Sequence, residues 1–143
     1  MIDGYGRTID YIRISVTDRC NLRCVYCMPE EGIPPVSHQE ILRFDEICRL
    51  AGIFGELGIR KIKLTGGEPL VRKNLPVLVK LLKETPGIEK VTLTTNGVLL
   101  AEQMRALADA GIDGINLSLD TLDPDIFAAI TRRRELERVK EGF

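Results

Sequence analysis

The chain has 143 residues, of which 44% are hydrophobic, so it has the length and the apolar content of a single domain with its own core. Its 20 Lys and Arg residues nearly balance its 21 Asp and Glu residues, and no apolar run approaches the roughly 20 residues of a membrane span. The polar start also lacks a signal-peptide stretch, so we expect a cytoplasmic protein without nucleic-acid or membrane partners.

Short runs rich in β-branched residues alternate with amphipathic stretches, which favours repeated strand–helix units around a parallel sheet. The predicted strands cover residues 11–16, 61–65, 90–94 and 114–119. The predicted helices cover residues 44–57, 75–83, 101–110 and 124–130, with a last helical piece at 135–143. Gly58 and Gly111 follow helices, and Asn74 is a predicted N-cap.

Each predicted strand has one apolar and one polar face, because strand residues two apart share a face. A sheet covered by helices on both faces would instead be apolar throughout. We therefore expect an α/β fold of the partial-barrel type, with helices on one face and a polar cavity on the other. The polar face carries Arg13, Ser15, Lys63, Thr65, Thr92, Thr94, Asn116 and Ser118. Its cations suit an anionic ligand; the alternative is a polar face that meets solvent or a further segment.

Three of the four cysteines, Cys20, Cys24 and Cys27, follow the first predicted strand at the spacing C-x3-C-x2-C. In reducing surroundings such clustering indicates metal rather than disulfides, and three soft thiolates on one loop suit an iron–sulfur cluster. Three ligands leave one iron of a four-iron cube open, whereas structural zinc and electron-transfer centres normally take four protein ligands. A zinc site would need His38 or Cys48, and neither has a partner at pair spacing. Cys48 is expected in the core.

This cysteine spacing, with Tyr26 before the last cysteine, resembles the signature of the radical S-adenosylmethionine superfamily. A second motif at residues 65–69, Thr-Gly-Gly-Glu-Pro, resembles the superfamily's GGEP motif, and glycines without Cβ let the backbone approach a ligand closely. The resemblance implies a [4Fe-4S] cluster and bound S-adenosylmethionine, which yields a 5′-deoxyadenosyl radical that abstracts hydrogen from substrate. The cofactor contacts that it implies are Tyr26, Gly66, Gly67, Glu68 and Ser118, and we expect Glu68 to orient its loop rather than to act as an acid or base.

Further segments narrow the resemblance to the GTP 3′,8-cyclase family of molybdenum cofactor biosynthesis. These segments are Gly6-Arg7, residues 11–20, Cys27-Met28-Pro29, Thr94-Thr95-Asn96-Gly97, residues 116–123 and residues 130–133. The family resemblance implies conversion of GTP to (8S)-3′,8-cyclo-7,8-dihydroguanosine 5′-triphosphate, with GTP contacts from Arg13, Lys63 and Thr94. Many family members have arginine in place of Lys63, and lysine keeps the charge but loses the planar fork. No side chain is assigned as catalytic.

Members of that family are much longer, with six strand–helix units and a second cysteine-bound cluster. This chain has about four such units and no second cysteine group, so we expect residues 1–143 to be the N-terminal portion of a radical SAM core domain, inactive alone. The implied partners are GTP, an electron donor and, in the full-length protein, a second copy in a homodimer. The alternatives are a radical enzyme with another substrate, a non-catalytic iron–sulfur module or a zinc-stabilised binding domain. The basic run at residues 132–134 is predicted to be a solvated helix face.

Overall fold

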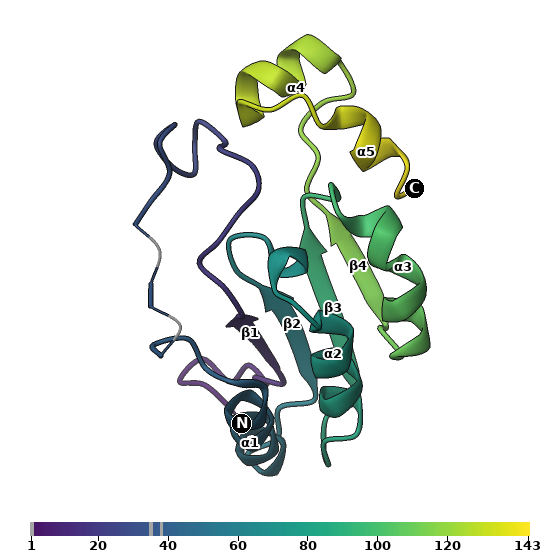
Figure 1. The fold of residues 1–143 in the computed structure, drawn as a ribbon. Coiled ribbons are helices and arrows are strands. Elements are labelled where there is room, and N and C mark those ends of the chain that lie inside the picture. Colours follow the sequence, from purple (N-terminus) through teal and green to yellow (C-terminus); the bar gives the residue numbers. More distant parts are fainter. Residues whose placement is uncertain (1, 35, 38) are drawn as a thin grey trace.

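The computed structural model describes residues 2–34, 36–37 and 39–143, and its centre is a parallel sheet with strand order β1-β2-β3-β4 (Figure 1). The strands are β1 (Tyr11–Ser15), β2 (Lys61–Thr65), β3 (Lys90–Thr95) and β4 (Gly114–Leu117). Arg13 of β1 pairs with Lys63 of β2, which pairs with Thr92 of β3, so the polar side chains line up across the sheet. His38 lies outside the described residues.

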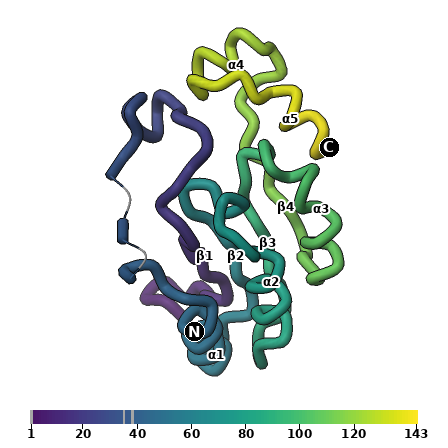
Figure 2. The backbone as a smooth tube through the Cα atoms, viewed as in Figure 1, coloured from purple at the N-terminus to yellow at the C-terminus, as the bar shows by residue number. Residues whose placement is uncertain are grey.

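Each strand is followed by at least one helix, as the alternating sequence pattern predicts. The helices are α1 (Phe44–Glu56), α2 (Leu75–Lys83), α3 (Leu100–Asp109), α4 (Pro124–Thr131) and α5 (Leu136–Lys140), with a short 3-10 helix η1 (Pro69–Val71). The backbone trace shows that α4 and α5 lie beyond the sheet, past the ends of β3 and β4 (Figure 2). No helix in the described part of the chain is long and apolar enough to cross a membrane.

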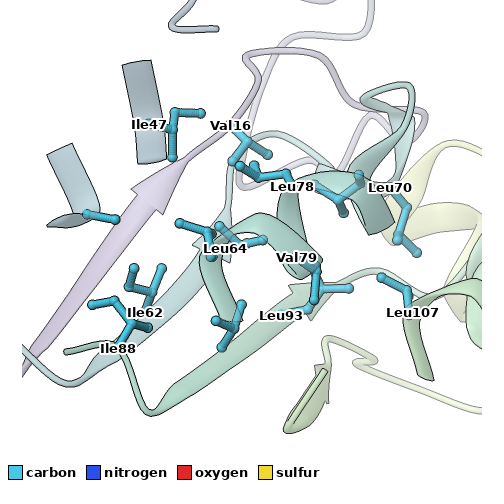
Figure 3. Packing of buried hydrophobic residues seen from close by; sticks show 14 of the residues in the cluster. Val16, Ile47, Ile62, Leu64, Leu70, Leu78, Val79, Ile88, Leu93 and Leu107 are labelled. Carbon is cyan, nitrogen blue, oxygen red and sulfur yellow. The ribbon is translucent and has the colours of Figure 1, made fainter. Parts of the chain in front are cut away.

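The apolar faces of the strands form the main core with α1, α2 and α3. Figure 3 shows Ile62, Leu64 and Leu93 of the sheet packing against Leu78 and Val79 of α2. Among the described residues, helices therefore cover one face of the sheet and none covers the polar face, which confirms the prediction of a partial-barrel α/β fold. The predicted core residue Cys48 is half-buried and packs against the edge of this cluster.

A second, smaller core joins the C-terminal helices to the loop after β1. Its buried members are Leu22, Val98, Phe127, Leu136 and Val139. Half-buried hydrophobic side chains, including two of the three clustered cysteines, pack against it. The cysteine loop is therefore supported by α4 and α5, and this contact joins residues about a hundred positions apart in the sequence.

Several predicted element boundaries differ from the structure; for example, α3 covers Leu100–Asp109 rather than 101–110, and α5 covers only Leu136–Lys140 of the predicted 135–143. β4 ends at Leu117, two residues before the predicted end, although the amide of Ser118 still pairs with Thr95; Leu119, like Leu117, packs against the second core. Asn74 does stand at the N-cap of α2, but it has a left-handed backbone with φ of 61° and its side chain makes no capping hydrogen bond. The prediction of Asn74 as the N-cap is therefore confirmed, although its side chain does not cap the helix.

Candidate functional site

A cavity of about 220 Å³ lies where the carboxyl ends of the parallel strands meet the cysteine loop. Because parallel strands end at the same edge of a sheet, loops that follow different strands come together there. The predicted site residues that line the cavity are Arg13, Cys20, Cys24, Tyr26, Cys27, Gly66, Gly67, Glu68, Thr94 and Ser118. The fold therefore gathers around one space residues that are spread over more than a hundred positions of sequence.

One residue predicted to contact GTP, Lys63, does not line this cavity. All of the residues predicted to contact a ligand lie in the described part of the chain. The ammonium of Lys63 lies on the polar face next to Arg13 in register, and it donates a hydrogen bond of 2.8 Å to Oδ1 of Asn116 on β4. A GTP contact from Lys63 stays a prediction; the bond to Asn116 uses one of the three donors of its ammonium.

The cysteine loop folds into a tight turn between its second and third cysteines. The amides of Cys27 and Met28 both donate to the carbonyl oxygen of Cys24, at 2.9 and 3.2 Å. The first cysteine is approached by two donors, the amide of Leu22 at 3.4 Å from its sulfur and Nδ2 of Asn96 at 3.8 Å. Such donors stabilise negative charge on a cysteine sulfur.

Asn96 is a site residue to which the sequence reasoning assigned no role. Besides approaching the sulfur of Cys20, its Nδ2 donates a 2.8 Å hydrogen bond to Oδ1 of Asn21 within the cysteine loop. Its Oδ1 accepts from the amide of Val98 at 3.1 Å. The segment that contains Asn96 directly follows a predicted strand, and that position at the carboxyl edge of the sheet is the signal that could have found it.

The three thiols differ in exposure: Cys20 and Cys24 are half-buried, whereas Cys27 is exposed. Burial raises the pKa of Cys20, and burial together with the neighbouring Cys27 and Cys20 raises the pKa of Cys24. All four cysteines are free. Because a metal binds the thiolate form, loading this site must release protons from the loop.

The donor set fits an iron–sulfur cluster better than a single metal ion. In the described part of the chain, no three His, Cys, Asp or Glu side chains converge as ligands of one ion. A zinc ion would draw every ligating sulfur to about 2.3 Å from one point, whereas each thiolate of a four-iron cube binds a different iron. Three soft thiolate donors around one cavity suit the second arrangement.

The Gly66–Gly67 turn packs directly against the backbone that precedes the cysteines. The amide of Gly67 donates to the carbonyl oxygen of Thr17 at 2.8 Å, and the amide of Glu68 donates to that of Arg19 at 2.7 Å. A Cβ on Gly66 would lie 2.5 Å from the oxygen of Thr17, and one on Gly67 would collide with the oxygen of Arg19. The two loops can thus touch only because these glycines lack Cβ. The sequence predicted close approach of a ligand at the glycines, but not this contact between loops.

The side chain of Glu68 is buried beneath this turn, although Glu68 is one of the residues that line the cavity. Its Oε1 accepts from the amide of Leu70 at 3.0 Å and from the hydroxyl of Thr95 at 2.6 Å, and its Oε2 accepts from the amide of Asn96 at 2.7 Å. Burial raises the pKa of Glu68, and these hydrogen bonds oppose the rise. Such contacts are those of a carboxylate that holds its loop in place.

Tyr26 and Ser118 both line the cavity. The hydroxyl of Tyr26 donates a 2.7 Å hydrogen bond to Oδ2 of Asp120, which raises the pKa of the phenol well above its usual value. The amide of Ser118 donates to the carbonyl oxygen of Thr95 at 2.8 Å and so continues the pairing of β4 with β3 by one residue. Asp120, also a cavity residue, had been given no role by the sequence reasoning.

The basic run after α4 is divided between two environments. Arg132 is half-buried, and its Nη1 donates to the carbonyl oxygens of Arg23 and Met28 in the cysteine loop, at 3.1 Å each. Arg133 and Arg134 are exposed, and Arg134 forms a loose surface ion pair with Asp125 at 3.6 Å. The prediction of a solvated face is therefore wrong for Arg132, because its side chain turns inward to the loop.

Comparison with known proteins finds a family and individual relatives that are similar to this chain. The profile of the Radical SAM superfamily matches residues 14–143. The whole chain is 52% identical to a GTP 3′,8-cyclase of Petrotoga mobilis and 56% identical to one of Peptoclostridium acidaminophilum, and it covers 44% of each. The chain thus spans less than half the length of these curated relatives.

Solved structures resemble the fold at low sequence identity. SuiB of Streptococcus suis, bound to its precursor peptide SuiA, matches with a TM-score of 0.71 and 21% identity, over 92% of this chain and 29% of SuiB. HydG, a maturase of the [FeFe]-hydrogenase, matches with a TM-score of 0.68 and 17% identity, over 92% of this chain and 32% of HydG. At such identities these structures show a shared fold.

Proposed function

This chain belongs to the radical SAM superfamily, and from that premise we propose that it carries the cluster- and cofactor-binding part of a GTP 3′,8-cyclase. The observation that carries the proposal is the cavity in which three cysteine thiols meet the Gly66–Gly67 turn and Ser118. When bound, a [4Fe-4S] cluster and S-adenosylmethionine together supply one-electron cleavage of the cofactor to a 5′-deoxyadenosyl radical. The residues of this chain bind and orient both groups.

In this proposal Cys20, Cys24 and Cys27 each hold one iron, and the fourth iron stays open to the cofactor. The donors at Leu22 and Asn96 favour the thiolate of Cys20, since a hydrogen bond to a charged acceptor is stronger than one to a neutral group. Cys20 and Cys24 are half-buried and Cys27 is exposed. The loop thus supplies the ligands, with two of the three partly shielded from solvent.

The substrate side of the proposal rests on charge and on the relatives. Arg13 brings a guanidinium to the cavity wall, and Thr94 adds a hydroxyl, which together suit the anionic and polar groups of GTP. More than half of the residues are identical to those of GTP 3′,8-cyclases across the whole chain. We assign residues 1–143 to one portion of the radical SAM core, and we infer that turnover requires an electron donor in a reducing compartment and the further length that the relatives have. Dimerisation of the full-length protein belongs to the same proposal.

The test is anaerobic reconstitution followed by electron paramagnetic resonance of the reduced chain. We expect a [4Fe-4S]⁺ signal that changes when S-adenosylmethionine is added, because the open iron binds it. Cys24→Ala should abolish the signal, whereas the matched control Cys48→Ser should keep it, since Cys48 packs against the main core.

Three results would count against parts of the proposal. A colourless protein with stoichiometric zinc would contradict the cluster. A cluster signal indifferent to S-adenosylmethionine would contradict the open iron. Cyclic product formed from GTP by the purified chain would contradict our expectation that these 143 residues are inactive alone.

A further inference from the structure

Arg132 stands at the point where α4 ends and the chain turns back. Its backbone is left-handed, with φ of 56°, and its amide donates to the carbonyl oxygen of Ala128 at 2.9 Å. A positive φ is uncommon for a residue with a side chain as large as arginine. The surrounding contacts must therefore favour this conformation, and they lie on the cysteine loop.

A single nitrogen of Arg132 joins both ends of the segment that carries two cysteines. Its Nη1 donates to the carbonyl oxygen of Arg23, directly before Cys24, and to that of Met28, directly after Cys27, at 3.1 Å each. Within the segment, the amides of Cys27 and Met28 already converge on the carbonyl oxygen of Cys24. The carbonyl groups of Arg23 and Met28 take no part in the hydrogen bonds within the turn. The guanidinium therefore closes the turn by donating to both of them.

The end of α4 also contacts the loop through its backbone. The amide of Arg23 donates to the carbonyl oxygen of Thr131 at 3.0 Å, and the amide of Val25 donates to that of Ile130 at 2.9 Å. The hydroxyl of Thr131 is in turn held by the carbonyl oxygen of Phe127 at 2.8 Å. The loop thus lies on a template formed by α4, and the side chain of Arg132 adds the contact that spans it.

We propose that Arg132 is a positioning residue, whose guanidinium bridges the carbonyls of Arg23 and Met28 and so sets the spacing of the Cys24 and Cys27 thiols before a cluster is bound. The identity of the bound cluster rests on the proposed function, but the bridge is a property of the chain alone. The bridge restricts the loop before anything binds. The loop therefore loses less conformational entropy when both thiols bind one inorganic group.

Two substitutions separate the bridge from simple packing. Arg132→Met keeps the bulk of the apolar stem and removes every donor. Arg132→Lys restores a cation with three donors on one nitrogen, which matches a bridge made by one nitrogen. Arg133→Met is the matched control, because Arg133 is exposed and its Nη1 donates to the carbonyl oxygen of its own neighbour, Arg132.

The first measurement is amide hydrogen exchange of the metal-free chain, followed by mass spectrometry. We expect Arg132→Met to exchange severalfold faster than the unchanged chain in the peptide that covers residues 23–28, and Arg132→Lys to recover most of the protection. Arg133→Met should behave as the unchanged chain. Unaltered exchange in Arg132→Met, or faster exchange spread equally over β2 and β3, would overturn the proposal.

The second measurement is the loss of iron to a chelator after anaerobic reconstitution, followed by the decay of cluster absorbance. Arg132→Met should lose iron severalfold faster than the unchanged chain, with Arg132→Lys between them. Equal rates would overturn a role of the bridge in holding the cluster. If the unchanged chain accepts no cluster, the proposed function fails, and the exchange measurement still decides whether the bridge positions the loop.

Discussion

Glu68 has 1% of its surface exposed, yet it carries a carboxylate whose two oxygens accept three hydrogen bonds. A buried carboxylate is costly unless its oxygens are satisfied, and here they are. The three donors come from the 3-10 helix η1, from the end of β3 and from the residue after β3. One side chain therefore holds the Gly66–Gly67 turn to the neighbouring strand.

Replacing Glu68 by alanine should destabilise the metal-free chain by about 3 kcal/mol, because buried donors at Leu70, Thr95 and Asn96 would lose their acceptor. The measurement is urea unfolding followed by circular dichroism. Glu89→Ala is the control: its side chain is 68% exposed and its contact with Arg60 is a loose one of 3.8 Å. We expect the control to stay within about 0.5 kcal/mol of the unchanged chain. Equal unfolding free energies of both variants would show that the contacts of Glu68 do not stabilise the fold.

At the scale of single residues, the sequence predicted side chains that carry recognisable chemistry in fixed spacing. Cys20, Cys24 and Cys27 do line one cavity together with Ser118. Asn96 and Arg132 could not be predicted in the same way, because their roles depend on carbonyls and sulfurs brought near by tertiary folding.

Asp113 connects three elements through the short loop before β4. Its carboxylate accepts from the ammonium of Lys83 at the end of α2, at 2.7 and 2.8 Å, and from the amide of Val91 in β3, at 2.6 Å. Partial burial raises the pKa of Asp113, but the hydrogen bonds from Lys83 and Val91 lower it more, so the pKa lies below its ordinary value. The charged form is therefore favoured by folding.

Asp113→Asn should cost about 1 kcal/mol at neutral pH, since the side chain is partly exposed and the ion pair is screened. A lowered pKa contributes stability above the ordinary carboxyl pKa and loses it as pH falls through the folded value. The gap in unfolding free energy between the unchanged chain and Asp113→Asn should thus be constant near neutrality and shrink below about pH 4. Urea unfolding at several pH values measures it, and a gap independent of acid would contradict the assignment.

At the scale of elements, periodicity predicted every helix and strand that surrounds the main core. The strand pattern of period two and the helix pattern of period 3.6 both depend on one buried face, which these elements have. The predicted end of β4 is two residues too late, because Leu119 continues the polar–apolar alternation of β4 although the strand does not extend to it. An apolar residue in the sequence does not reveal which core will bury it.

Considered whole, the molecule has two cores of unequal size, and the cysteine loop depends on the smaller one. Phe127 of α4 is 3% exposed and packs with Leu22, Val98, Leu136 and Val139. The thiol-bearing residues Cys20 and Cys24 pack against the same cluster. Damage to this core should therefore reach the cysteines before it reaches the sheet.

Phe127→Ala should remove about 3–5 kcal/mol of packing free energy from the second core. In the metal-free chain, we expect the thiols to react severalfold faster with a disulfide reagent, while the circular dichroism of the main core changes little. Ile126→Ala is the matched control, because the neighbouring Ile126 is 52% exposed and should leave thiol reactivity unchanged. Thiol rates that are the same in both variants would show that the second core does not support the loop.

The one-sided helical cover was predictable from the sequence, because each strand alternates apolar and polar residues. The second core was not, since Leu22 and Phe127 share no local pattern and meet only after the sheet has placed their loops at one edge. The sequence therefore predicted the wall of the partial barrel and the three cysteines that line the cavity, whereas the support of the cysteine loop required the three-dimensional contacts.

The close packing of Gly66 and Gly67 on Thr17 and Arg19 has a dynamic consequence. Two backbone hydrogen bonds and the lack of space for a Cβ couple the turn to the segment that leads into the cysteines. Displacing either loop must carry the other with it, because sliding between them would break both hydrogen bonds. Slow fluctuations of the sheet would then move the two ligand-binding loops as one rigid body and leave the distance between them constant.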